Sequence, residues 1–246
     1  NYFYPDLPKS YQISQFEEPI CSNGYLEVEV DNVVTKIRIN RVHIEEDAGK
    51  MIHVGSPGIW GAKASAVDFN RASCPLIEIV TEPDISSPQE AKEYVVMLRA
   101  ILMSLGICDG NMEEGNLRCD ANVSIRKKGE VKLGVKTEIK NVNSFKAIER
   151  SLIYEINRQK QIKKRGGSIG QETRLWNESS QKTILMRTKG ESDDYRYFPD
   201  PDLLPLTVNE ELITELKKNI PDLPLVKKKR YMENFGLSYD ESRLLI

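Results

Sequence analysis

A short stretch near the middle of the chain alternates apolar and polar residues without interruption, from residue 116 to residue 125. In an extended strand this places Arg118, Asp120 and Asn122 on one face, with neighbours about 6.6 Å apart at a rise of ~3.3 Å per residue. Glu114 adds a carboxylate just before the strand. The pattern predicts a polar strand face whose side chains can share a ligand or the coordination shell of a metal ion.

A second acidic cluster, Glu45-Glu46-Asp47, follows His43 at the end of another predicted strand. Carboxylate oxygens are the hard ligands that Mg²⁺ prefers. If the strand stays regular, His43, Glu45 and Asp47 share a face and Glu46 lies on the opposite one, whereas a bulge at the acids reverses this grouping. On local grounds alone, a solvated acidic turn is the alternative interpretation.

Glu78 lies in the middle of an apolar segment, residues 76–80, which is typical of a buried strand. A buried carboxylate is costly unless it is paired or bound to a metal. We therefore expect either a metal-binding or catalytic role, or a structural ion pair with Arg71 or a lysine. Further along, Lys136, Glu138 and Lys140 alternate on one strand face and are equally compatible with a phosphate ligand or with solvent.

Periodicity and turn signals predict the elements that position these side chains. A capping box at Ser87 begins one amphipathic helix, which ends near Gly106, and Ser144 begins a second. The second helix has a basic tail, residues 158–165, for which the interpretations are a solvated helix end or an RNA contact. The remaining expectations are hairpins over 24–44 and 171–188, a loop over 55–66, aromatic and proline-rich loops near one cleft at 1–9 and 192–202, and short helices from about 221.

Composition narrows the class of protein. A formal net charge of −2 over 246 residues excludes a uniformly basic nucleic-acid binder. The four cysteines are widely spaced, and no segment has the pattern of a signal peptide or a membrane span, which indicates a reducing, cytoplasm-like compartment. The sequence has neither a P-loop nor a Rossmann glycine motif. We predict an α+β fold: a largely antiparallel sheet cradle with flanking helices over 1–220, followed by the start of a helical domain over 221–246.

Several of these segments together resemble one protein family. They are residues 2–15, 68–83 and 112–122, supported by the stretches 43–50 and 193–199. In this order they are similar to the B subunits of aspartyl/glutamyl-tRNA amidotransferases. The resemblance implies a protein that uses ATP and Mg²⁺ to phosphorylate the side-chain carboxylate of glutamate on tRNA-Gln or aspartate on tRNA-Asn.

The resemblance also implies partners. In such complexes an amidase, known as the A subunit, releases ammonia from glutamine, and this ammonia displaces the phosphate. A small C subunit completes the complex, which works in the cytoplasm or an organellar matrix and without a membrane. Family members begin with a further strand of the type Gly-Leu-Glu-Val-His that supplies metal ligands, and continue into further helical and tail domains. These parts are not in this sequence, so we expect the chain alone to be inactive.

The site assignment combines the resemblance with the residue patterns. By resemblance, Glu46 and Glu78 correspond to metal-binding and catalytic carboxylates, with Asp120 as a third catalytic acid and Glu114 beside it. The resemblance favours Glu46 over Glu45, which requires a bulge or an early strand end at the acids. The metal set also includes Glu45 and His43, and the expected ATP-binding residues are Glu114, Arg118, Asn122, Lys140 and Arg196.

Two rival functions remain. A non-catalytic scaffold that docks tRNA or a partner protein has no need of a carboxylate inside an apolar strand, so Glu78 distinguishes it from the enzyme. A metal-dependent hydrolase would usually use histidine ligands, yet the chain contains only His43 and His53.

Overall fold

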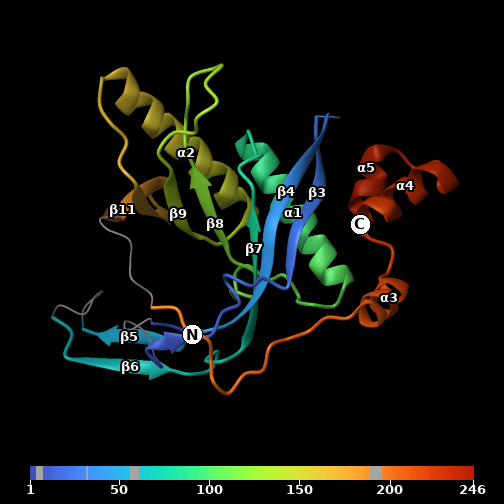
Figure 1. The fold of residues 1–246 in the computed structure, drawn as a ribbon. Helices are drawn as coiled ribbons and strands as arrows, with labels where there is room; N and C mark the ends of the chain where they lie inside the picture. The colour runs from blue at the N-terminus through green and yellow to red at the C-terminus, as the bar shows by residue number, and fades with distance from the viewer. Residues whose placement is uncertain (4–7, 32, 56–60, 189–195) are drawn as a thin grey trace. The chain divides into compact units, whose positions relative to one another are not determined.

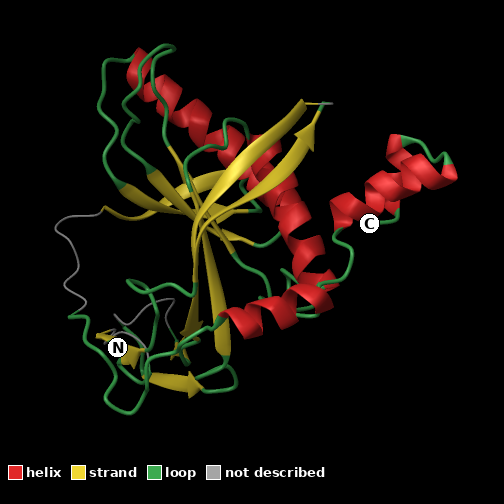
Figure 2. Cartoon of the chain, turned by 45° about the vertical axis from the view of Figure 1, so that its right-hand side comes forward, coloured by secondary structure: helices red, strands yellow, loops and turns green. Residues whose placement is uncertain are grey.

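The computed structural model describes residues 1–3, 8–31, 33–55, 61–188 and 196–246. The chain forms two compact units and passes repeatedly between them: unit 1 comprises residues 1–26, 36–84 and 192–207, and unit 2 comprises residues 27–35, 85–191 and 208–246. The described part of unit 1 contains strands and no α-helix, whereas the five described helices all belong to unit 2 (Figure 2). This segregation confirms the predicted α+β class.

The central feature of unit 1 is a three-stranded sheet in the order β3-β4-β7. Its strands are β3 (Cys21–Val30), β4 (Val33–Glu46) and β7 (Pro75–Thr81), and the tips of β3 and β4 belong to unit 2. The predicted hairpin over 24–44 is confirmed, and the fully buried Ile37 of β4 lies in its core. The long continuous β4 matters for the candidate site because Glu45 and Glu46 lie at its end.

Two smaller ladders complete unit 1. β1 (Tyr2–Phe3) pairs with β2 (Tyr11–Gln12), and β5 (Lys50–Val54) pairs with β6 (Ala64–Asp68). The predicted loop over 55–66 was therefore wrong at its end, because residues 64–66 already belong to β6. The local signal was weak, since glycines and a proline in the sequence do not show where a neighbouring strand begins.

The two aromatic, proline-rich segments of unit 1 lie together in their described parts. The amino group of Asn1 donates to the carbonyl of Phe198 at 2.8 Å, and the ring centroids of Tyr2 and Tyr197 lie 5.5 Å apart. Residues 4–7 and 192–195 of these segments lie outside the described residues. The contact agrees with the expected neighbourhood of the segments, and their role as the lining of a cleft stays a prediction.

Unit 2 is built on a four-stranded sheet in the order β11-β10-β9-β8. The strands are β8 (Cys119–Val123), β9 (Thr137–Val142), β10 (Glu172–Asn177) and β11 (Lys182–Thr188). β9 and β10 run parallel and are joined through α2 (Phe145–Lys164), whereas the other pairs are antiparallel. α2 lies across the sheet (Figure 1), and Ile148 of the helix and Ile139 of β9 are fully buried between them.

Local signals explain the helix boundaries. α1 (Pro88–Ser104) begins with the predicted capping box between Ser87 and Glu90, and Ser144 caps α2. α4 (Pro224–Phe235) and α5 (Tyr239–Leu244) confirm the predicted short helices. α3 (Glu210–Asn219) was not predicted, and it carries no buried side chain. Within the described residues, no helix combines the length and apolar character needed to span a membrane.

Candidate functional site

The pairing of β4 with β7 brings together three of the four predicted metal ligands. His43 and Glu78 are direct cross-strand partners, and Glu45 lies two residues beyond His43 on the same face of β4. One ligand atom from each of these residues lies within 4.8 Å of the other two. We call His43, Glu45 and Glu78 the acidic triad.

Hydrogen bonds orient the acidic triad from one side. Nε2 of His43 lies 3.0 Å from Oε1 of Glu45 and 3.9 Å from Oε2 of Glu78. The hydroxyl of Ser14 donates to the same Glu45 oxygen at 2.7 Å. His43 is fully buried, and the ring of Phe16 meets it edge-on at 6.2 Å between centroids. The imidazole is therefore held in place while its Nε2 points at both carboxylates.

The donor set can be tested against a divalent ion. Mg²⁺ usually takes one or two protein carboxylates and fills its other positions with water and phosphate oxygens. Glu45 and Glu78 can supply that pair of oxygens. A histidine nitrogen suits softer metals better, and metal-binding histidines usually anchor their second ring nitrogen. Among the described residues Nδ1 of His43 has no hydrogen-bond partner. The triad thus fits Mg²⁺ held by its two carboxylates, with His43 orienting Glu45.

Glu46 lies outside the acidic triad. Its Oε1 pairs with Nζ of Lys9 at 3.0 Å and accepts from the backbone N–H of Ile13 at 3.0 Å. Burial alone would lower the pKa of Lys9, but the hydrogen bond and the charge of Glu46 outweigh it and raise that pKa. The expected bulge or early strand end at the acids was wrong, because β4 runs through Glu46 and the register shift in its pairing with β7 lies upstream, between Ile39 and Arg41.

The environment of Glu78 also differs from the expectation. Its side chain is 50% exposed, so β7 is not the buried strand that its apolar sequence indicated. β7 is an edge strand of the described three-stranded sheet, and Ile77 and Glu78, which lie on its opposite faces, are both exposed. Burial therefore no longer distinguishes an enzyme from a scaffold, and the position of Glu78 opposite His43 becomes the informative feature.

Unit 2 carries the second group of predicted residues on the exposed face of β8 and β9. Nζ of Lys140 lies 2.8 Å from Oδ2 of Asp120 and 3.6 Å from Oε1 of Glu138. The hydroxyl of the buried Thr173 donates to the other oxygen of Glu138 at 2.9 Å. Lys140 is thus positioned by two carboxylates on neighbouring strands, one of which is anchored to β10.

The alternation predicted around residue 120 is confirmed, although the strand is shorter than the pattern. Arg118, Asp120 and Asn122 are exposed, whereas the residues between them are partly buried. Burial, helped by the charge of Asp120, raises the pKa of the Cys119 thiol to about 12, so this thiol does not provide a nucleophile near neutral pH. Glu114 lies in the exposed turn before the strand, where the amide of Asn116 donates to it at 3.4 Å.

The predicted residues fall into both units. Unit 1 holds the acidic triad, Glu46 and Arg196, whose guanidinium lies 5.5 Å from the ring centre of Phe3. Unit 2 holds Asp120 and the other expected ATP-binding residues. The convergence of the two groups on one bound nucleotide stays a prediction.

The sequence pattern missed three supporting residues: Ser14, Lys9 and Thr173. Ser14 forms an isolated bridge with Glu45, and this pairing joins segments about 30 positions apart without any local signal. Lys9 and Thr173 likewise act through long-range contacts with Glu46 and Glu138.

Comparisons with known proteins decide the family. Residues 1–214 match the model described as the GatB/GatE catalytic domain. The chain belongs to this family. A relative from Carboxydothermus hydrogenoformans is 54% identical over all of this chain and 50% of its own length, and one from Thermodesulfovibrio yellowstonii is 55% identical with the same coverage. Both are named as the B subunit of an aspartyl/glutamyl-tRNA(Asn/Gln) amidotransferase, and the chain spans about half of their length.

Proposed function

We propose that this chain provides the kinase site of a tRNA-dependent amidotransferase. In this reaction the γ-phosphoryl group of ATP is transferred to the side-chain carboxylate of glutamate on tRNA-Gln or aspartate on tRNA-Asn, which gives an acyl phosphate and ADP. Ammonia from glutamine, supplied by a partner amidase in a complex with a small third protein, then displaces phosphate and forms the amide. The family and the names of the relatives support this proposal.

The observation that carries the proposal is the acidic triad. A carboxylate is a poor electrophile, and phosphoryl transfer to it requires that the negative charges of both reactants be neutralised. A divalent ion supplies that neutralisation when bound, and Glu45 and Glu78 are the residues that would hold it. His43 keeps Glu45 in place through its Nε2, which lies 3.0 Å from the carboxylate.

The exposed face of unit 2 carries a second set of charged side chains. Lys140, fixed between Asp120 and Glu138, offers a cation for a phosphate oxygen, and Arg118 lies on the same strand face. Asp120 holds the ammonium group of Lys140 in a defined position, so loss of its charge would loosen the lysine. These roles require rigid strands. Asp120 lies on β8, Lys140 lies on β9, and Arg118 directly precedes β8.

The test uses the assembled amidotransferase and two variants, Glu78→Gln and Asp120→Asn. We expect each to lower ATP-dependent amidation by at least about a hundredfold, the size of effect seen when one preorganised electrostatic group is lost. Glutamine hydrolysis by the partner amidase should remain measurable. Glu82→Gln is the matched control, because this carboxylate follows β7 directly and accepts a hydrogen bond from Asn40 at 2.6 Å.

The outcome also separates the enzyme from a docking scaffold. A scaffold requires neither carboxylate, so full amidation by both variants would refute the site. If Glu78→Gln and Glu82→Gln lower the rate equally, the effect belongs to the strand and not to the acidic triad.

A further inference from the structure

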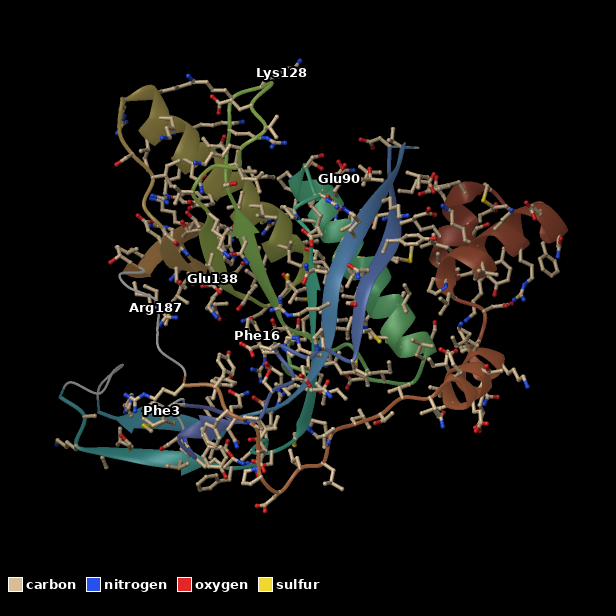
Figure 3. All side chains as sticks on the ribbon, viewed as in Figure 1. Phe3, Phe16, Glu90, Lys128, Glu138 and Arg187 are labelled. Carbon is tan, nitrogen blue, oxygen red and sulfur yellow. The ribbon has the colours of Figure 1, made fainter. Side chains whose placement is uncertain are left out.

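The connection between β8 and β9 concentrates positive charge at one end of unit 2. We call residues 124–136 the basic loop. It contains one acid, Glu130, and five cations, which are Arg126, Lys127, Lys128, Lys132 and Lys136. The whole chain has a formal net charge of −2, so this loop departs strongly from the average. Figure 3 shows Lys128 at the tip of the loop.

The basic loop is braced at its base. Nε2 of Gln159, on α2, donates to the carbonyl of Val123 at 3.2 Å and to the hydroxyl of Thr137 at 3.1 Å, and these residues are the two ends of the flanking strands. The arms of the loop approach closely, because a Cβ on Gly134 would lie 2.2 Å from the carbonyl oxygen of Ile125. The side chains beyond this neck are therefore presented from a fixed base.

The C-terminal end of α2 adds further cations to those of the basic loop. Lys163 follows Gln159 by four residues, which places it on nearly the same side of the helix as the residue that anchors the loop. Lys160 and Lys164 form the adjacent row, and both are exposed, as is Lys163. We call the basic loop together with Lys160, Lys163, Lys164 and Arg165 the basic end. Within the described ranges, no carboxylate lies within 4.0 Å of any of its cations.

Exposed apolar side chains lie between the cations of the loop. Val131 is 91% exposed, and Leu133 and Val135 are each 48% exposed. A solvated lysine loop has no need of these groups, and exposed apolar surface of this kind gains free energy when a partner covers it. Cations that contact phosphates, together with apolar groups that contact sugars or bases, are suited to a nucleic-acid strand.

We propose that the basic end binds the sugar-phosphate backbone of RNA, and that it serves as a docking surface for the tRNA substrate. The assignment of that RNA as tRNA rests on the proposed function. The dipole of α2 also favours cations at its C-terminus, but this effect is confined to the last turn of the helix and does not account for the cations of the loop. An anionic membrane is a poorer match, because amphipathic membrane anchors present a broad apolar helix face.

The test compares two triple variants of this 246-residue chain with equal changes in charge. One replaces cations of the basic end, Lys128→Gln, Lys132→Gln and Lys163→Gln. The control replaces exposed lysines of α3 and α4, Lys217→Gln, Lys218→Gln and Lys229→Gln. The probe is unacylated tRNA, and its binding is followed by fluorescence anisotropy over a series of salt concentrations.

We expect the basic-end variant to bind tRNA at least about tenfold more weakly than the control variant, and its log–log salt slope to be smaller by about 3, one for each lost phosphate contact. An unchanged melting temperature confirms that both variants fold. Equal losses in the two variants would overturn the proposal, because they would reflect net charge alone. The absence of any tRNA binding by the unmodified chain at low salt would also overturn it.

A parallel measurement uses vesicles of equal parts phosphatidylcholine and phosphatidylserine. If the chain bound these vesicles as tightly as tRNA, and if this binding depended on the same lysines, the ligand of the basic end would be a membrane surface and not RNA. The proposed kinase site is independent of this result, since Glu78→Gln should abolish amidation while leaving tRNA affinity unchanged. Loss of tRNA affinity in the basic-end variant with an intact acidic triad therefore tests the docking surface alone.

Discussion

Two clusters of charged side chains, one in each unit, differ in the number of hydrogen bonds that their carboxylate oxygens accept from the described protein groups. In unit 2 the fully buried Glu155 of α2 accepts hydrogen bonds on both oxygens. Arg158 donates at 2.7 and 2.9 Å, Gln159 at 3.1 Å and Thr183 at 3.0 Å, while Arg174 lies at 3.6 Å. This carboxylate joins α2 to the sheet and leaves no room for an added ligand.

The acidic triad of unit 1 has the opposite character. Ser14 and His43 both lie within hydrogen-bond distance of one oxygen of Glu45, Oε1, and the side chain of Glu78 is 50% exposed. Both clusters contain polar groups on neighbouring elements, so composition does not distinguish them. The accessibility of the oxygens does: a closed cluster stabilises the fold, whereas an open acidic cluster retains coordination sites for a cation.

The largest effect expected from this comparison is the loss of Glu155. Glu155→Ala removes a shared partner of two arginine side chains whose exposed fractions are 19% for Arg158 and 12% for Arg174. Glu172 remains 3.1 Å from Arg158 and 2.8 Å from Arg174, so both arginines keep one counterion. We expect the free energy of unfolding to fall by about 2–3 kcal/mol, because the variant removes a buried acceptor of charge-assisted hydrogen bonds. Urea denaturation followed by circular dichroism measures this change. A loss below about 1 kcal/mol would show that the cluster is not structural.

The pH dependence of the free energy of unfolding provides a control for the Glu155→Ala prediction. Burial alone would raise the pKa of Glu155, but hydrogen bonds and charge from Arg158, with hydrogen bonds from Gln159 and Thr183, outweigh it and lower the pKa below 4.5. A carboxyl group with a lowered pKa contributes stability above its unfolded pKa and loses that contribution as the pH falls through the folded value. The difference in stability between the unmodified chain and Glu155→Ala should therefore be constant near neutral pH and shrink below about pH 4.5.

The acidic triad predicts a different response, in which metal binding is lost and stability is kept. Glu45→Gln should lower the affinity for Mn²⁺, used as a paramagnetic substitute for Mg²⁺, by at least about tenfold, while the free energy of unfolding changes by less than about 1 kcal/mol. Glu46→Gln is the matched control, because this neighbouring carboxylate is paired with Lys9 on the other face of β4. Water proton relaxation measures both affinities. A larger effect at Glu46 would reverse the assignment and restore the ligand that the family resemblance favoured.

Sequence patterns were sufficient where a single segment determines the outcome. The alternation around Asp120 correctly separated the exposed from the partly buried side of β8, and the capping box at Ser87 placed the start of α1. The rule that a regular strand groups Glu45 with His43 was also correct. Each of these signals depends on the backbone period of one element, which the sequence carries directly.

Sequence patterns failed where the outcome depends on the arrangement of several segments. Glu78 has apolar neighbours on both sides, yet only the strand order shows that β7 lies at a sheet edge and leaves this carboxylate half exposed. No local signal showed which of two adjacent acids would lie beside His43, and the preference for Glu46 as a ligand, which came from the resemblance, stays a prediction. The contact between Ser14 and Glu45 was likewise invisible, since it joins distant segments.

The smallest expected effect comes from an ion pair on the surface of unit 2. Nζ of Lys92 on α1 lies 3.3 Å from Oε2 of Glu149 on α2, and the two side chains are 30% and 31% exposed. Because water and salt screen such a pair, Lys92→Gln should lower the free energy of unfolding by less than about 1 kcal/mol, and added salt should reduce the difference further. The same urea titrations measure it. If this loss approached that of Glu155→Ala, exposed and buried ion pairs would stabilise unit 2 equally. The number of hydrogen bonds that a carboxylate accepts would then not determine its contribution to stability. The contrast with the open acidic triad would lose its physical basis.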